Sequence, residues 1–175
     1  RGAWERRKGI ELEGRTLGLI GCGIIGRLVA EFALALGMDV IAYDVVPDYA
    51  YTPSSRFRFA SLDEVIRSAH VLSLHCPSLG RPLIDETSLA KTRKGVIIVN
   101  TARHDLIDAQ ALVSALDHGR VAGAALDVFA TEPPTDDILA RHDRVIATPH
   151  IGGFTDESVD RAVDVAVENL LKHLG

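Results

Sequence analysis

The chain has 175 residues, of which 47% are hydrophobic and 25% are charged, and its formal net charge at pH 7 is −5. This composition is typical of one globular domain, and the acidic balance argues against a nucleic-acid-binding surface, which is usually basic. With only two cysteines, the chain has neither a disulfide framework nor a paired-cysteine metal motif, and we expect no metal site. No signal peptide and no apolar run long enough to span a membrane is present, so no membrane association and a cytoplasmic location are expected.

Short apolar runs, typical of strands that are buried on both faces, alternate with helix-like segments along the chain. Strands are predicted at Thr16–Ile20, Val40–Asp44, Val71–His75, Val96–Asn100, Ala122–Val128 and Val145–Thr148. Helices are predicted at 26–36, at 61–69 after a capping box, at 109–116 after the capping residue Asp108, and from Thr155 or Asp156 onward. Residues 45–60, which include two prolines, are predicted to form a surface loop. This order predicts an α/β fold with a doubly wound parallel sheet in one domain over residues 1–175.

A glycine-rich loop, Gly21-Cys22-Gly23-Ile24-Ile25-Gly26, follows the first predicted strand and precedes the first long helix. In this context Gly21 permits a tight turn, Gly23 lets a pyrophosphate approach the backbone, and Gly26 permits close packing of helix and strand. The helix N-terminus supplies amide donors and a positive dipole for phosphate. A glycine-rich turn without a ligand is the alternative, but the combination of strand, loop and helix favours a Rossmann-type dinucleotide site.

Asp44 ends the second predicted strand, where a carboxylate accepts hydrogen bonds from the ribose hydroxyls of the adenosine. A carboxylate at this position would repel a ribose 2′-phosphate, and the neighbouring Val45 and Val46 supply no guanidinium to attract one. The predicted cofactor is therefore NAD rather than NADP.

Three further polar side chains, Arg103, Glu132 and His150, come shortly after predicted strands. Because the carboxyl ends of parallel strands form one edge, we expect these side chains to gather where ligands bind. A guanidinium can bind a carboxylate, and an imidazole with a carboxylate partner can move a proton. The simpler alternatives are an Arg103 that pairs with a nearby acid such as Asp105, a solvated Glu132 and a structural histidine. No serine-hydrolase elbow and no Walker-type loop is present.

Together, these motifs resemble the nucleotide-binding domain of the NAD-dependent D-isomer-specific 2-hydroxyacid dehydrogenases. The segments before the first strand, Trp4-Glu5-Arg6 and Glu11-Leu12-Glu13-Gly14, are most similar to the D-3-phosphoglycerate dehydrogenase branch. The matching motifs, in the order of the family, are the glycine loop, Asp44, His75-Cys76-Pro77, Asn100-Thr101-Ala102-Arg103, Ala125-Leu126-Asp127-Val128-Phe129, Glu132-Pro133 and Pro149-His150-Ile151-Gly152-Gly153.

The resemblance implies an oxidoreductase that transfers a hydride between NAD and a small D-2-hydroxy acid or 2-oxo acid, with 3-phosphoglycerate as the expected substrate. It implies that Arg103 binds the substrate carboxylate, that His150 is the acid and base, and that Glu132 orients the imidazole. The alternative is a non-catalytic NAD-sensing interaction module, as in the corepressor members of the family.

The resemblance also implies the residues that contact the cofactor. Asp127 would accept a hydrogen bond from the nicotinamide carboxamide, and Cys76 and Thr101 would lie beside the two riboses. The full set of expected cofactor contacts is Gly21, Gly23, Ile24, Ile25, Gly26, Asp44, Cys76, Pro77, Thr101, Ala102, Arg103, Asp127, His150, Gly152 and Gly153.

The chain departs from the family pattern in three ways. His104-Asp105 follows the arginine where the family usually has glycine, and the segment between Pro77 and Leu83 is short. The substrate domain of the family is absent from the sequence, so we expect weak turnover by this chain alone. The family is usually dimeric through this domain, so the resemblance implies a homodimer in which the segment around Trp4 reaches the partner. The alternative is that Trp4 packs onto its own domain.

Overall fold

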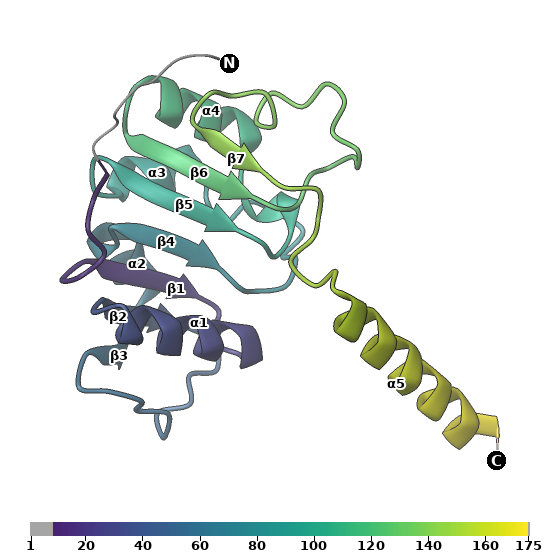
Figure 1. Ribbon diagram of the computed structural model, residues 1–175. Helices are drawn as coiled ribbons and strands as arrows, with labels where there is room; N and C mark the ends of the chain where they lie inside the picture. The colour runs from purple at the N-terminus through teal and green to yellow at the C-terminus, as the bar shows by residue number, and fades with distance from the viewer. Residues whose placement is uncertain (1–8, 175) are drawn as a thin grey trace.

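A computed structural model, shown in Figure 1, describes residues 9–174, so that Trp4 lies outside the described residues. Seven strands pair in parallel to form one sheet with the order β3-β2-β1-β4-β5-β6-β7. The strands are β1 (Thr16–Ile20), β2 (Asp39–Tyr43), β3 (Phe57–Phe59), β4 (Val71–Leu74), β5 (Val96–Asn100), β6 (Val121–Leu126) and β7 (Val145–Ala147). The helices are α1 (Ile24–Ala35), α2 (Leu62–Ser68), α3 (Glu86–Lys91), α4 (Ala109–Asp117) and α5 (Asp156–Leu174), with a 3₁₀ turn η1 (His104–Leu106). The predicted doubly wound parallel sheet is confirmed.

Two hydrophobic clusters lie on opposite faces of the sheet, because successive side chains of a strand point to opposite sides. In β1, Leu17 and Leu19 pack with α1, whereas Ile20 packs in the larger cluster with α2, α3 and α4. Helices α2 and α4 begin where the sequence predicts them: the Ser61 side chain accepts a hydrogen bond from the Glu64 amide, and Asp108 accepts one from the Ala111 amide. Helix α1 begins at Ile24, two residues before its predicted start. Helices therefore bury both faces of β1 and β2, whereas buried residues alternate with partly exposed ones along β5.

The predicted surface loop at 45–60 is wrong in its last part, since Phe57–Phe59 forms β3 and pairs with β2. The Phe57 ring is buried and packs edge-to-face on Tyr51 and Phe59, at centroid distances of 5.1 and 5.2 Å. These aromatic contacts stabilise β3. With only three residues, the strand is too short to show a clear alternation of apolar and polar residues, and nearby prolines and serines favoured the prediction of a loop. Helix α3 was also not predicted. It begins with a capping box that Asp85 and Ser88 form.

Helix α5 projects away from the sheet (Figure 1), and none of its residues is buried. Its apolar residues follow helical spacing, as predicted, but Val159, Val163 and Leu170 are all exposed. Among the helices of the described residues, none combines the length and the apolar character that crossing a membrane requires.

The turn after β1 generates a prediction about stability. Gly21 has φ +95°, and a Cβ atom there would lie 2.5 Å from the His75 carbonyl oxygen. Left-handed geometry and overpacking each cost an alanine about 1–2 kcal/mol or more, so Gly21→Ala is expected to lower the free energy of unfolding by about 3 kcal/mol. Gly80 has φ +67° and open space around it, so Gly80→Ala is expected to cost about 1 kcal/mol. Urea unfolding measures both variants, and equal losses would contradict the close contact at Gly21.

Candidate active site

Six neighbouring strands end in register at one edge of the sheet. The last paired residues, in spatial order, are Tyr43, Ile20, Leu74, Asn100, Leu126 and Ala147. The residues that follow them directly are Asp44, Gly21, His75, Thr101, Asp127 and Thr148. The glycine loop, Asp44 and the segments that lead to Cys76, Arg103, Glu132 and His150 therefore leave the sheet at the same level, in the crevice where parallel α/β sheets bind ligands.

The glycine loop and Asp44 form one unit at the ends of β1 and β2. The Asp44 carboxylate accepts hydrogen bonds from the Cys22 amide at 2.7 Å and from the Val46 amide at 3.0 Å. Gly23 begins α1, and no atom lies within 4 Å of the position that its Cβ would take. Because Gly23 has no side chain to cap the helix, the first-turn amides have no side-chain acceptor and can bind an anion.

The loops around this unit contain the other predicted cofactor contacts. Ile24 and Ile25 are exposed at the start of α1, and Cys76 is half-buried after β4. Burial raises the pKa of the Cys76 thiol, so this side chain is protonated near neutral pH. The remaining predicted contacts lie in the loops that leave β4, β5 and β7 at the same edge: Pro77, Thr101, Ala102 and Gly153.

A buried asparagine holds the turn that carries Arg103. The Asn100 side chain accepts a hydrogen bond from the Ala102 amide at 3.0 Å and donates one to the Arg103 carbonyl at 2.8 Å. Sequence reasoning did not assign Asn100 to the site, although an asparagine that ends an apolar strand is a signal for such a turn. The structure therefore adds Asn100 as the residue that shapes this turn.

The Arg103 guanidinium is exposed at the edge of the sheet. It donates to the Ala102 carbonyl at 2.6 Å, and it makes no ion pair within residues 9–174. Asp105, the acid that could have paired with it, accepts a hydrogen bond from the Ser78 hydroxyl instead. Most donors of the guanidinium are free to bind an anionic ligand.

Glu132 and His150 are brought together as the sequence predicts. The His150 Nδ1 atom lies 2.9 and 3.1 Å from the two carboxylate oxygens of Glu132, which also accepts a hydrogen bond from the Phe129 amide. The hydrogen bond from His150, followed by that from Phe129, holds the pKa of the Glu132 carboxyl below its ordinary value. Since a carboxylate only accepts, Nδ1 carries the hydrogen, and Nε2 is the atom that can exchange a proton.

Asp127 is buried beneath the segment that carries His150. Its carboxylate accepts hydrogen bonds from the Thr148 hydroxyl at 2.5 Å, the Ile151 amide at 2.9 Å and the Gly152 amide at 2.8 Å. Burial raises the pKa of the Asp127 carboxyl, but these three donors outweigh it, and the pKa lies below its ordinary value. Gly152, an expected cofactor contact, thus donates its amide to Asp127.

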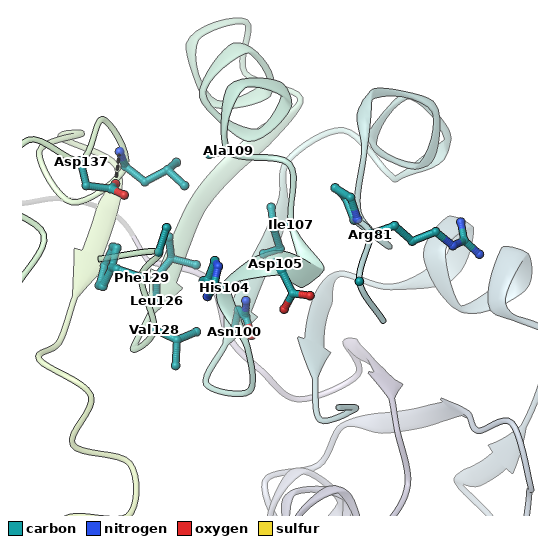
Figure 2. Close-up of a pocket in the computed structure, with 14 residues that line it drawn as sticks. Arg81, Asn100, His104, Asp105, Ile107, Ala109, Leu126, Val128, Phe129 and Asp137 are labelled. Carbon is teal, nitrogen blue, oxygen red and sulfur yellow. Dashed lines mark hydrogen bonds between the residues drawn. The ribbon is translucent and has the colours of Figure 1, made fainter. Parts of the chain in front are cut away.

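A cavity of about 360 Å³ lies beside this edge, between η1 and the loop after β6. In Figure 2, the imidazole of His104 lies near Asn100 and Leu126, whereas the guanidinium of Arg81 points away from the cavity. His104 therefore lines the cavity. Within the described part of the chain, no three side chains of histidine, cysteine, aspartate or glutamate come together as a metal site.

Comparison with known proteins gives consistent matches. The family model described as "D-isomer specific 2-hydroxyacid dehydrogenase, NAD binding domain" matches residues 1–152. A hydroxypyruvate reductase of Thermotoga maritima is 46% identical over 99% of this chain and 58% of that protein. A D-3-phosphoglycerate dehydrogenase of Mycobacterium bovis is 45% identical over 93% of this chain and 32% of that protein.

Solved structures match as well. A D-lactate dehydrogenase from Aquifex aeolicus, complexed with NAD and lactic acid, superposes with a TM-score of 0.88 and 34% identity over 98% of this chain and 57% of that chain. This chain therefore spans less than two thirds of the length of these relatives. The shared motifs, the sheet order and the family match agree that the chain belongs to the D-isomer-specific 2-hydroxyacid dehydrogenase family, in which it corresponds to the NAD-binding domain.

Proposed function

We propose that this domain binds NAD along the carboxyl edge of the sheet and serves in hydride transfer between NAD and a D-2-hydroxy acid. The observation that carries the proposal is the common register of the six strand ends, which sets the glycine loop, the Arg103 turn and the Glu132–His150 pair on one edge. Such an arrangement combines a phosphate site with a carboxylate-binding group and a proton-transfer group.

The residues at this edge fit a dinucleotide. The open space at Gly23 and the first-turn amides of α1 suit a pyrophosphate, and Asp44 lies beside them to accept ribose hydroxyls. Two of the roughly four lone-pair positions of the Asp44 carboxylate are occupied by Cys22 and Val46, so acceptor capacity remains. The other expected contacts, from Cys76 and Pro77 to Gly152 and Gly153, complete the proposed site.

Bound NAD supplies the hydride acceptor in oxidation, and its reduced form supplies the donor in reduction. His150 takes the proton of the substrate hydroxyl through Nε2 in oxidation and returns it in reduction. Glu132 holds the ring through Nδ1 and stabilises the imidazolium. Arg103 binds the substrate carboxylate, for which its planar guanidinium is suited.

As the substrate of the protein that contains this domain we propose 3-phosphoglycerate. The similarity to D-3-phosphoglycerate dehydrogenases supports this choice, and hydroxypyruvate is the second compound to test, because a relative that is 46% identical is named a hydroxypyruvate reductase. Turnover of 3-phosphoglycerate with NAD by that protein would reject a purely non-catalytic sensor.

For its organisation, we propose that residues 1–175 form one dinucleotide-binding domain that acts together with a substrate domain and assembles as a homodimer. Cys22 and Cys76 are both free thiols, which supports a reducing, cytoplasmic location. Sedimentation equilibrium tests the homodimer, since a monomer at all concentrations would contradict it.

The role of Asp44 predicts a preference between cofactors. The chain is expected to bind NADH more tightly than NADPH, and Asp44→Asn is expected to reduce that preference by about tenfold, because the charge that repels a 2′-phosphate is lost. Fluorescence titration with both nucleotides measures the ratio. Asp39→Asn, at the opposite end of β2, is the matched control and is expected to leave the ratio unchanged. Tighter binding of NADPH by the unmodified chain would contradict the assignment.

The role of His150 predicts a loss of turnover. In a protein that joins this domain to its substrate domain, His150→Gln is expected to lower kcat by about 10²–10⁴-fold, the usual contribution of a general acid and base. His118→Gln, at the end of α4, is the control and is expected to retain the rate. Steady-state assays of oxidation and of reduction measure kcat for both variants. An unchanged kcat in His150→Gln would contradict the role of His150 as acid and base.

A further inference from the structure

The segment after β7 presents His150 in an unusual backbone conformation. The His150 amide donates to the Thr148 carbonyl at 3.0 Å, which closes a three-residue turn around Pro149. His150 itself has φ +54°, the one left-handed residue other than glycine within residues 9–174. Such a conformation costs on the order of 1 kcal/mol or more and persists only where the surrounding structure enforces it.

The contacts that hold the His150 backbone in this conformation come from Asp127, which lies directly after β6. Its carboxylate binds the chain on both sides of His150: the Thr148 hydroxyl before it, and the amides of Ile151 and Gly152 after it. We call these three hydrogen bonds the Asp127 clamp. Because the clamp holds both flanks of one residue, it limits the backbone conformations that this residue can adopt.

The clamp is fixed to the sheet. The Asp127 amide donates to the Asn100 carbonyl of β5, and the Thr148 amide donates to the Leu126 carbonyl of β6, both at 3.0 Å. A Cβ atom on Gly152 would lie 3.0 Å from the Asp127 carboxylate, so a larger residue would press on the clamp. The turn is therefore built onto the rigid end of two strands.

We propose that Thr148, acting through Asp127, is a positioning residue that holds His150 in the left-handed conformation in which its imidazole meets Glu132. The use of that imidazole in proton transfer rests on the proposed function, but the clamp and its effect on the Glu132 contact do not. Of the roughly four lone-pair positions of the Asp127 carboxylate, the clamp occupies three, so its expected contact with the nicotinamide carboxamide remains compatible.

The contact between His150 and Glu132 provides a readout that stability alone would not change. Because the hydrogen bond from His150 is the main cause of the low pKa of Glu132, release of the ring is expected to raise that pKa. The pKa can be followed by ¹³C NMR titration of the labelled glutamate carboxyl groups in the 175-residue chain. His150→Gln, which removes the imidazole, gives the full size of the rise.

Thr148→Val removes the hydroxyl at nearly constant size and is expected to produce most of that rise. Thr148→Ser keeps the hydroxyl and is expected to keep the Glu132 pKa low. Thr92→Val is the matched control. Thr92 is also buried, and its hydroxyl donates to the Leu89 carbonyl at 2.8 Å. This residue precedes β5 and therefore lies at the opposite edge of the sheet from His150. This control is expected to lose stability without a change in the Glu132 pKa.

An unchanged Glu132 pKa in folded Thr148→Val would overturn the proposal, as would an equal rise in Thr92→Val. If Thr148→Val does not fold, Gly152→Ala takes its place, with a rise in the same direction expected and no rise contradicting the clamp. If Thr148→Val raises the Glu132 pKa while His150→Gln retains full turnover, the clamp stands and the proposed function fails.

Discussion

The site depends on the common register of six parallel strands. Each of these strands ends at the same level, from Tyr43 of β2 to Ala147 of β7, so that side chains far apart in sequence begin on one line. In the five strands with buried side chains, β1, β2, β4, β5 and β6, apolar packing favours this register, since a shift by one residue would turn buried side chains to the opposite face. The chemistry at the edge is therefore positioned by the hydrophobic core beneath it.

Polar side chains at the strand ends shape the loops that leave the sheet. Asp44 binds the glycine loop, Asn100 binds the Arg103 turn, and Asp127 binds the segment around His150. Each binds backbone amides close to a group that we assign to the cofactor or the substrate. Within residues 9–174, no buried side-chain nitrogen or oxygen lacks a hydrogen-bond partner. Because an unpaired buried polar group is costly, these contacts also favour one loop conformation over others.

The sequence predicted the sheet and the glycine loop, because strand patterning and motif spacing are local signals. The pairing of Glu132 with His150, 18 positions apart, was implied by the resemblance to the family. It did not predict β3, a strand of three residues that is stabilised by pairing with β2 and by aromatic contacts with Tyr49 and Tyr51 in the segment just before it. It also did not reveal that Thr148 and Gly152 bind Asp127, since the residues of the clamp are more than 20 positions apart along the chain. Contacts of this kind follow from the register of β6 and β7, which the sequence pattern alone does not specify.

A crystal structure of this chain with NAD tests the central claim most directly. The account predicts the pyrophosphate at the glycine loop, the adenosine ribose on Asp44, and the nicotinamide between the Arg103 turn and His150. A cofactor bound on another face of the sheet, or a nicotinamide remote from His150, would contradict it.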